Sequence, residues 1–117
     1  MTEDRYTRML IAQAKKRKLI FANWRRYVAE IKKFASEMLG SDVEVIIFGS
    51  LVRAEHVVGL SDIDVMIVSQ KFKNPKIKYE LLAELLTQFG DPFEFHLVTP
   101  NEKKIYMHFI KKEYIKI

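Results

Sequence analysis

Three short, largely apolar runs constrain the fold of this chain more than any other feature. They cover residues 43–48, 62–68 and 93–98. Runs of this length, when bounded by turn-forming residues, are typical of strands rather than helices. Gly49-Ser50 ends the first run, and Gly90-Asp91-Pro92 precedes the third. The sequence therefore predicts three strands.

Helix signals lie between and after these runs. Asn74-Pro75 predicts a helix over about residues 75–89, because Asn caps helices and Pro suits the first helical position. Residues 99–102 read Thr-Pro-Asn-Glu, which is the pattern of a capping box and predicts a last helix. The apolar residues that continue this last helix are Ile105, Phe109 and Ile110.

The N-terminal third of the chain is predicted to be helical. Thr2 is the expected N-cap, with Glu3 and Asp4 in the first turn, and Gly40 is the expected stop. The stripe expected to pack on the rest of the fold is Ile20, Trp24, Val28, Ile31, Ala35 and Met38. The pattern leaves open whether this segment is one helix or two helices broken near residues 19–23.

The order of these elements predicts an α+β fold, with a small mixed β-sheet packed against helices. Only a short connection separates the first two strands, so we expect them to be adjacent and antiparallel. The length of 117 residues suits a single domain. We expect a helical segment over residues 1–40 and a core over residues 41–117.

Composition limits the kinds of metal site and of membrane segment that the chain could form. The sequence has no cysteine, so a metal would have to be bound by oxygen or imidazole ligands. No apolar run has the length of about 18 residues that a membrane span needs, and the N-terminus does not resemble a signal peptide. We expect a soluble, cytoplasmic protein.

The positive charge is concentrated near the N-terminus. Residues 1–40 hold 10 basic against 4 acidic residues, and residues 41–117 hold 10 against 11. The run Lys15-Lys16-Arg17-Lys18 could attract nucleic acid or an acidic protein, but a basic run on a helix is usually a solvated face. Nucleic-acid binding is an alternative that we do not favour.

Alternation along the predicted strands gathers acidic groups on one face. Asp62 and Asp64 share a face of their strand, as Glu94 and His96 do on theirs, while the apolar neighbours point the other way. If the two strands lie near each other, three carboxylates converge, and such a cluster needs a cation. Oxygen ligands favour a hard ion, so Asp62, Asp64 and Glu94 are candidate ligands for Mg²⁺ or Mn²⁺. We interpret His96 as a hydrogen-bonding neighbour.

Gly49 and Ser50 are candidates for the phosphate side of the same site. Glycine lets a triphosphate approach the backbone, and Ser50 could open a short helix whose N–H groups hold phosphate oxygens. Arg53, one turn further on, could add a cation. Trp24 and the phenylalanines are interpreted as core residues rather than a platform for stacking bases.

These residues together resemble a known signature. Phe48-Gly49-Ser50, eleven residues, and then Asp62-Ile63-Asp64-Val65 is similar to the motif of the DNA polymerase β-like nucleotidyltransferase superfamily. The resemblance implies that both aspartates and a later acid, here Glu94, bind metal and that the Gly-Ser turn binds triphosphate. Two positions depart from the usual pattern: Glu94 replaces an aspartate, and Ala54 stands where close relatives often have glycine.

The short chain is similar in length to the minimal nucleotidyltransferases of prokaryotes. Members of that group often pair, as antitoxins, with a helical HEPN toxin, and some transfer AMP from ATP to a tyrosine of the toxin. The resemblance therefore implies a HEPN-type partner, with a homo-oligomer as the alternative. A non-catalytic antitoxin or scaffold is the competing hypothesis. Intact Asp62, Asp64 and Ser50 favour catalysis, because converging acids cost stability when no metal is bound.

Overall fold

The computed structural model describes residues 4–117. Its elements in chain order are α1 (Arg5–Ala22), α2 (Trp24–Leu39), β1 (Glu44–Phe48), β2 (Ile63–Val68), the short 3-10 helix η1 (Gln70–Lys73), α3 (Pro75–Gln88), β3 (Phe93–Val98), α4 (Pro100–Ile110) and β4 (Tyr114–Lys116). The three predicted strands and the last two predicted helices are confirmed. The sequence does not predict η1 or β4, because each is too short to show a periodic pattern.

The N-terminal segment forms two helices that meet at Asn23. The Asn23 side-chain amide donates to the Leu19 carbonyl at 2.9 Å, and its backbone N–H donates to the Leu19 and Ile20 carbonyls, which ends α1. At the other end of α1, Asp4 is the N-cap and accepts from the Thr7 N–H at 2.7 Å. The predicted first-turn place of Asp4 was therefore wrong, and Thr2 and Glu3 lie outside the described residues.

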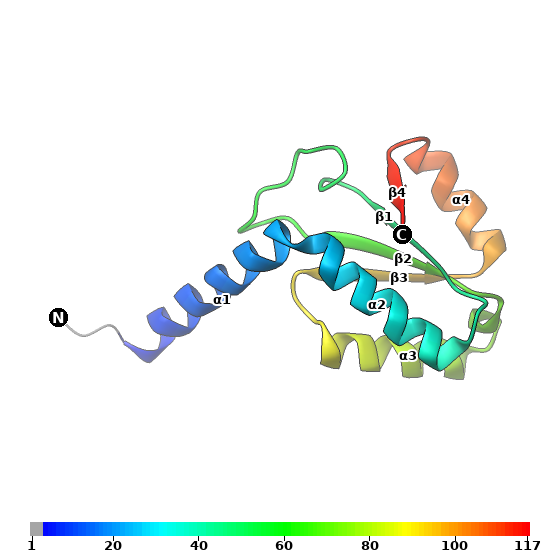
Figure 1. The fold of residues 1–117 in the computed structure, drawn as a ribbon, viewed down its shortest axis with the longest axis horizontal. Coiled ribbons are helices and arrows are strands. Elements are labelled where there is room, and N and C mark those ends of the chain that lie inside the picture. Colours follow the sequence, from blue (N-terminus) through cyan, green and yellow to red (C-terminus); the bar gives the residue numbers. More distant parts are fainter. Residues whose placement is uncertain (1–3) are drawn as a thin grey trace.

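β2 lies inside a four-stranded mixed sheet with the order β3-β2-β1-β4 (Figure 1). It pairs antiparallel with β1, as predicted, and parallel with β3. β4 pairs antiparallel with the outer side of β1. The predicted α+β fold with a small mixed sheet is confirmed.

The main core fills the space between one face of the sheet and the helices α1, α2 and α3. Alternate residues of every strand point into it, so that Val45 and Ile47 of β1 meet Val65 and Ile67 of β2 on the same face. The helix residues buried there include Ile20, Phe21, Val28, Ile31, Ala35, Leu39, Leu81 and Leu85. The prediction for Met38 was wrong: the stripe continues from Ala35 to Leu39, four residues on, and leaves Met38 exposed.

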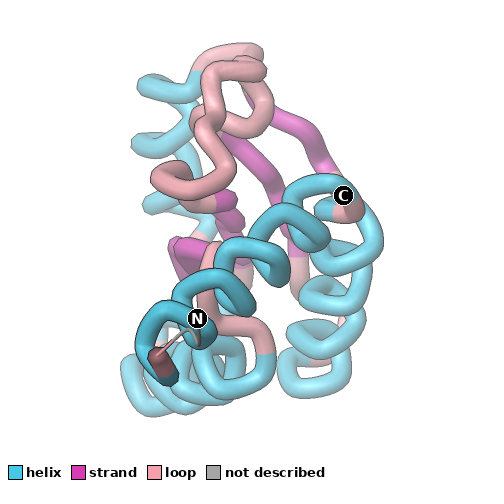
Figure 2. The backbone as a smooth tube through the Cα atoms, turned by 90° about the vertical axis from the view of Figure 1, so that its left-hand side faces the viewer, coloured by secondary structure: helices cyan, strands magenta, loops and turns pink. Residues whose placement is uncertain are grey.

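α4 covers part of the opposite face of the sheet, so helices flank the strands on both sides (Figures 1 and 2). The sheet residues beneath it form a second, smaller apolar cluster: Ile46, Met66, Val68 and Val98. α4 packs on them through Tyr106, Met107 and Ile110. Phe109 is 78% exposed, so its predicted place in the core was wrong. The apolar face of α4 is wider than the sheet surface on which it rests.

α1 projects from the body of the protein and lengthens the molecule to 56 × 30 × 21 Å (Figure 1). Its outer half leaves Tyr6, Met9, Leu10 and Ile11 exposed. No helix among residues 4–117 combines the length and the apolar character that crossing a membrane requires.

Residues 49–62 connect β1 to β2 without a regular helix or strand. The connection begins with a turn, in which the Arg53 N–H donates to the Gly49 carbonyl at 3.2 Å and the Glu55 N–H donates to the Ser50 carbonyl at 2.9 Å. The short helix predicted to begin at Ser50 is therefore a turn. Ala54 lies in this turn with φ of 57°, in the left-handed region that costs a residue with a Cβ about 1–2 kcal/mol.

The strain at Ala54 generates a prediction about stability. Ala54→Gly should stabilise the protein by about 0.5–1 kcal/mol, because glycine adopts a positive φ without steric cost. Thermal or urea unfolding measures the change. The matched control is Ala83→Gly, at an exposed position inside α3, which should destabilise by about 1 kcal/mol. A loss of stability in Ala54→Gly would show that the alanine methyl contributes more than its backbone strain costs.

Candidate active site

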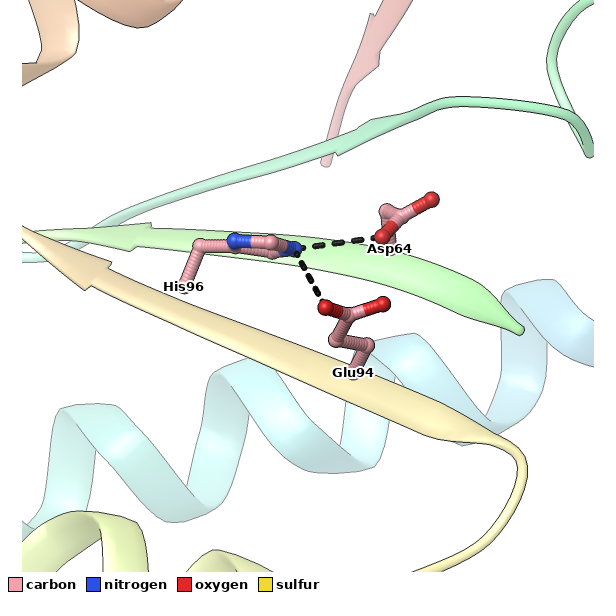
Figure 3. A group of neighbouring side chains, drawn as sticks. All are labelled: Asp64, Glu94 and His96. Carbon is pink, nitrogen blue, oxygen red and sulfur yellow. Dashed lines mark hydrogen bonds and ion pairs between the residues drawn. The ribbon is translucent and has the colours of Figure 1, made fainter.

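The parallel register of β2 and β3 brings two acids side by side. Asp64 pairs in register with Glu94, and both side chains point to the face of the sheet that carries α4. His96 extends from the next position of β3 on the same face toward both carboxylates (Figure 3). One ligand atom from each of these residues lies within 4.8 Å of the others. The predicted convergence of Asp64 and Glu94 is thus present in the structure.

His96 holds the Asp64 carboxylate in place. Its Nε2 lies 3.1 Å from Asp64 Oδ1 and 3.9 Å from Glu94 Oε1, and its Nδ1 lies 3.4 Å from the Tyr106 hydroxyl. A tautomer with its proton on Nε2 satisfies these contacts, since it donates to Asp64 and accepts from Tyr106. Phe48 packs against the His96 ring with centroids 5.1 Å apart. The imidazole therefore lies between the acids and α4.

Gly49 lies directly against Asp64. Its φ of 85° favours glycine, and a Cβ built at this position would overlap Asp64 Oδ2. Both observations explain why the chain has no side chain here. The turn that follows β1 therefore contacts the acid of β2.

The other predicted site residues surround this centre. Asp62 is exposed one residue before β2 and lies outside the close group formed by Asp64, Glu94 and His96. Ser50 follows Gly49 and is half-buried. Arg53 is exposed and forms an ion pair with Glu55, with Nε and Oε2 3.1 Å apart.

A cleft of about 490 Å³ opens over this part of the sheet. Gly49 and Asp64 lie in its wall, together with the cationic side chains of Arg53 and Lys111. Phe48 and Phe109 line it as well. Glu113 lines the cleft too, so that two acidic groups and two cations lie beside a glycine turn. Such a mixture of charges is suited to a metal-bound polyphosphate.

Electrostatics at Glu94 favour a bound cation. Partial burial raises the pKa of Glu94, and the negative charges of Asp64 and Asp62 raise it further, whereas His96 lowers it. Asp62 is therefore within electrostatic reach of Glu94. A cation among these groups would offset the repulsion, and the carboxylate oxygens of Asp64 and Glu94 are ligands that a hard divalent metal prefers. The residues present fit such an ion.

Arg17 is a residue whose importance the sequence does not reveal. It belongs to the basic run that we interpreted as a solvated face, but its side chain is buried. Its guanidinium donates to the carbonyls of Val58 and Ser61 and forms an ion pair with Asp91. Ser61 lies two residues before the start of β2, and Asp91 lies two residues before the start of β3. Arg17 therefore ties α1 to the starts of both acid-bearing strands.

Comparison with known proteins agrees with the geometry. A family model described as nucleotidyltransferase domain matches residues 28–117. A crystal structure of a protein provisionally described as a nucleotidyltransferase is 38% identical, with a TM-score of 0.68, over 78% of this chain and 97% of that chain.

A second crystal structure is similar in fold alone. It is that of a protein from Sulfolobus solfataricus, also provisionally described as a nucleotidyltransferase, and is 19% identical with a TM-score of 0.56 over 88% of this chain and 84% of that chain. No curated protein matches the sequence. The family match includes all the residues of the acidic centre, and on this basis the chain belongs to the nucleotidyltransferase domain family.

Proposed function

We propose that this protein is a metal-dependent nucleotidyltransferase that transfers AMP from ATP to a hydroxyl group of an acceptor. The contact between the Gly49 turn and Asp64, with Glu94 beside it, is the observation that carries the proposal. At this contact, a backbone segment that a phosphate can approach lies next to carboxylates that can bind a metal. Nucleotidyl transfer needs these two features within one small site.

Each residue of the site has a distinct proposed role. Asp62, Asp64 and Glu94 would hold Mg²⁺ or Mn²⁺, which when bound offsets triphosphate charge and lowers the pKa of an acceptor hydroxyl. Gly49 and Ser50 would contact the triphosphate, and Arg53 would add a positive charge at the rim of the cleft. His96 orients Asp64 from the side of Tyr106.

The reaction balances as a substitution at the α-phosphorus. The acceptor oxygen forms a bond to this phosphorus, the bond to the bridging oxygen breaks, and pyrophosphate leaves. The acceptor hydroxyl gives up its proton, and we assign its uptake to Glu94, because this carboxylate lies beside Asp64 and is open to solvent.

The acceptor that we propose is a tyrosine of a HEPN-type partner, so that the protein would act as an antitoxin. This step rests on the resemblance to minimal nucleotidyltransferases, and the surface of α1 supports it. The helix sequence from Arg5 to Ala22 contains six basic residues and no acidic residue, and its outer half exposes an apolar stripe. Two copies of such a helix would repel each other, which favours an acidic partner over a homo-oligomer.

Asp64→Asn should abolish transfer while leaving the fold intact. The change keeps the shape of the side chain but removes a charge next to Gly49 and His96, and we expect a loss of about 100-fold or more. Intact mass spectrometry of the protein with its co-purified partner, Mg²⁺ and each triphosphate detects an added nucleotide, and circular dichroism monitors the fold. The control is Glu80→Gln on the exposed side of α3. Undiminished transfer by Asp64→Asn would refute the proposed site.

Glu94→Gln should slightly stabilise the metal-free protein at neutral pH. The raised pKa means that the folded protein binds this proton more tightly than the unfolded chain does, so stability falls as pH rises through the window between the two pKa values. Because the side chain is largely exposed, we expect only a small gain in stability at neutral pH. The gain should disappear in acid, where the carboxyl group is protonated in both the folded and the unfolded protein.

Thermal unfolding with and without Mg²⁺ measures this effect. Saturating Mg²⁺ should stabilise the wild type more than Glu94→Gln, because the variant lacks a charged ligand. Equal stabilisation of the two proteins by Mg²⁺ would remove Glu94 from the proposed metal site.

Reversing two charges on α1 should weaken association with the partner and leave nucleotide binding unchanged. Arg8→Glu with Lys15→Glu changes exposed residues far from Gly49 and Asp64 and preserves the buried Arg17. We expect partner affinity to fall about tenfold at low salt, with a smaller difference at high salt. Lys76→Glu on α3 is the charge-matched control. If the double variant associates as tightly as the wild type, the partner does not bind α1.

A further inference from the structure

An apolar cleft adjoins the charged cleft of the candidate active site. Its volume is about 350 Å³, and it is lined by Phe48 of β1 and by Ile105, Tyr106, Phe109 and Ile110 of α4. Phe48, Phe109 and Ile110 line the charged cleft as well. The two clefts therefore adjoin each other, and Phe109 lies at their border.

Two of the four α4 side chains in this cleft have no structural role that explains their exposure. Ile105 is 63% exposed and Phe109 is 78% exposed, whereas Tyr106 and Ile110 rest on the second core cluster. Exposing two large apolar side chains one turn apart on a helix is unfavourable unless something covers them. The structure thus presents a polar compartment with Arg53, Lys111 and Asp64 next to an apolar, aromatic one.

We propose that the apolar cleft binds the nucleobase of the donor triphosphate, with the base stacked on Phe109. A nucleoside triphosphate has the same division, with a highly charged chain at one end and a flat, uncharged ring at the other. The inference rests on the proposed function, because it places the triphosphate over Gly49 and Asp64. The aromatic residues that line this charged cleft are Phe48 and Phe109, and both also line the apolar cleft.

A small ligand fits the apolar cleft better than a protein segment does. Its volume lies within the range of about 300–1,000 Å³ that is typical of small-molecule sites. A protein segment seated on Phe109 would also cover the mouth of the charged cleft that Phe109 lines. The exposed stripe of α1, at the opposite end of the molecule, offers a protein partner a surface clear of the site (Figure 1).

This placement determines which bases the protein prefers. The residues lining the apolar cleft offer one side-chain polar group, the Tyr106 hydroxyl, and it contacts His96 Nδ1 at 3.4 Å. A base would therefore be recognised by stacking area rather than by hydrogen bonds to its edge. We expect ATP and GTP to bind with affinities within about threefold of each other and to bind several-fold more tightly than CTP and UTP.

Calorimetry with the full-length protein in Mg²⁺ and without acceptor tests the inference. The probes are ATP, GTP, CTP and inorganic tripolyphosphate, which has no base. Phe109→Ala should weaken ATP and GTP about tenfold, leave tripolyphosphate unchanged and remove the preference for purines. Phe109→Trp should restore purine binding. Tyr79→Ala, at a similarly exposed aromatic residue of α3, is the matched control and should change nothing.

The outcomes separate this inference from the proposed function. Unchanged ATP affinity in Phe109→Ala would overturn the base site, and so would an equal loss for tripolyphosphate, which would place the effect in the charged cleft. A loss of partner association without any loss of ATP affinity would also overturn it, in favour of a protein docking surface. Failure of the proposed function appears separately, as tripolyphosphate binding that does not depend on Mg²⁺ or on Asp64.

Discussion

The hydrogen-bonded position of β2 between β1 and β3 is the constraint on which the rest of the molecule depends. β2 is buried on its helix-facing side through Ile63, Val65 and Ile67, so its register cannot slip by one residue without exposing these side chains. The same register directs Asp64 to the opposite face. It sets Asp64 beside Glu94 on one neighbour and beside Phe48, the residue before the glycine turn, on the other. Burial of the main core thus fixes which side chains reach the opposite face, where the acids lie beside α4.

The N-terminal helices extend this constraint beyond the sheet. The connection from β1 to β2 has no regular structure, and Arg17 holds it by donating to Val58 and Ser61 while pairing with Asp91. A buried cation is stable only when such partners satisfy it, so α1 cannot shift without disturbing the starts of β2 and β3. The position of α1 at Arg17 is therefore tied to the segments that precede Asp62 and Glu94.

The sequence predicts features that depend on local periodicity and misses features that depend on contacts between distant residues. Alternation correctly separated Ile63 from Asp64, and cap residues located α3 and α4, because these signals lie within a few residues. The burial of Arg17 could not be read from a basic run, since its partners lie over 40 residues away. The exposure of Phe109 was missed because periodicity identifies an apolar face but not how much of it finds a surface to cover.

The exposed surfaces of α4 and α1 also limit how a nucleotide and an acceptor could occupy the open site together. Phosphoryl substitution places the attacking and leaving oxygens roughly in line, so the acceptor approaches the α-phosphorus from the side opposite to pyrophosphate. If the base rests on α4, the nucleotide occupies the side of the sheet nearest Phe109 and Lys111. The free approach is then past Asp62 and the connection that Arg17 anchors, near the base of the projecting α1 (Figure 1). A partner docked on α1 would meet the nucleotide from this direction without competing for the surface that binds the base.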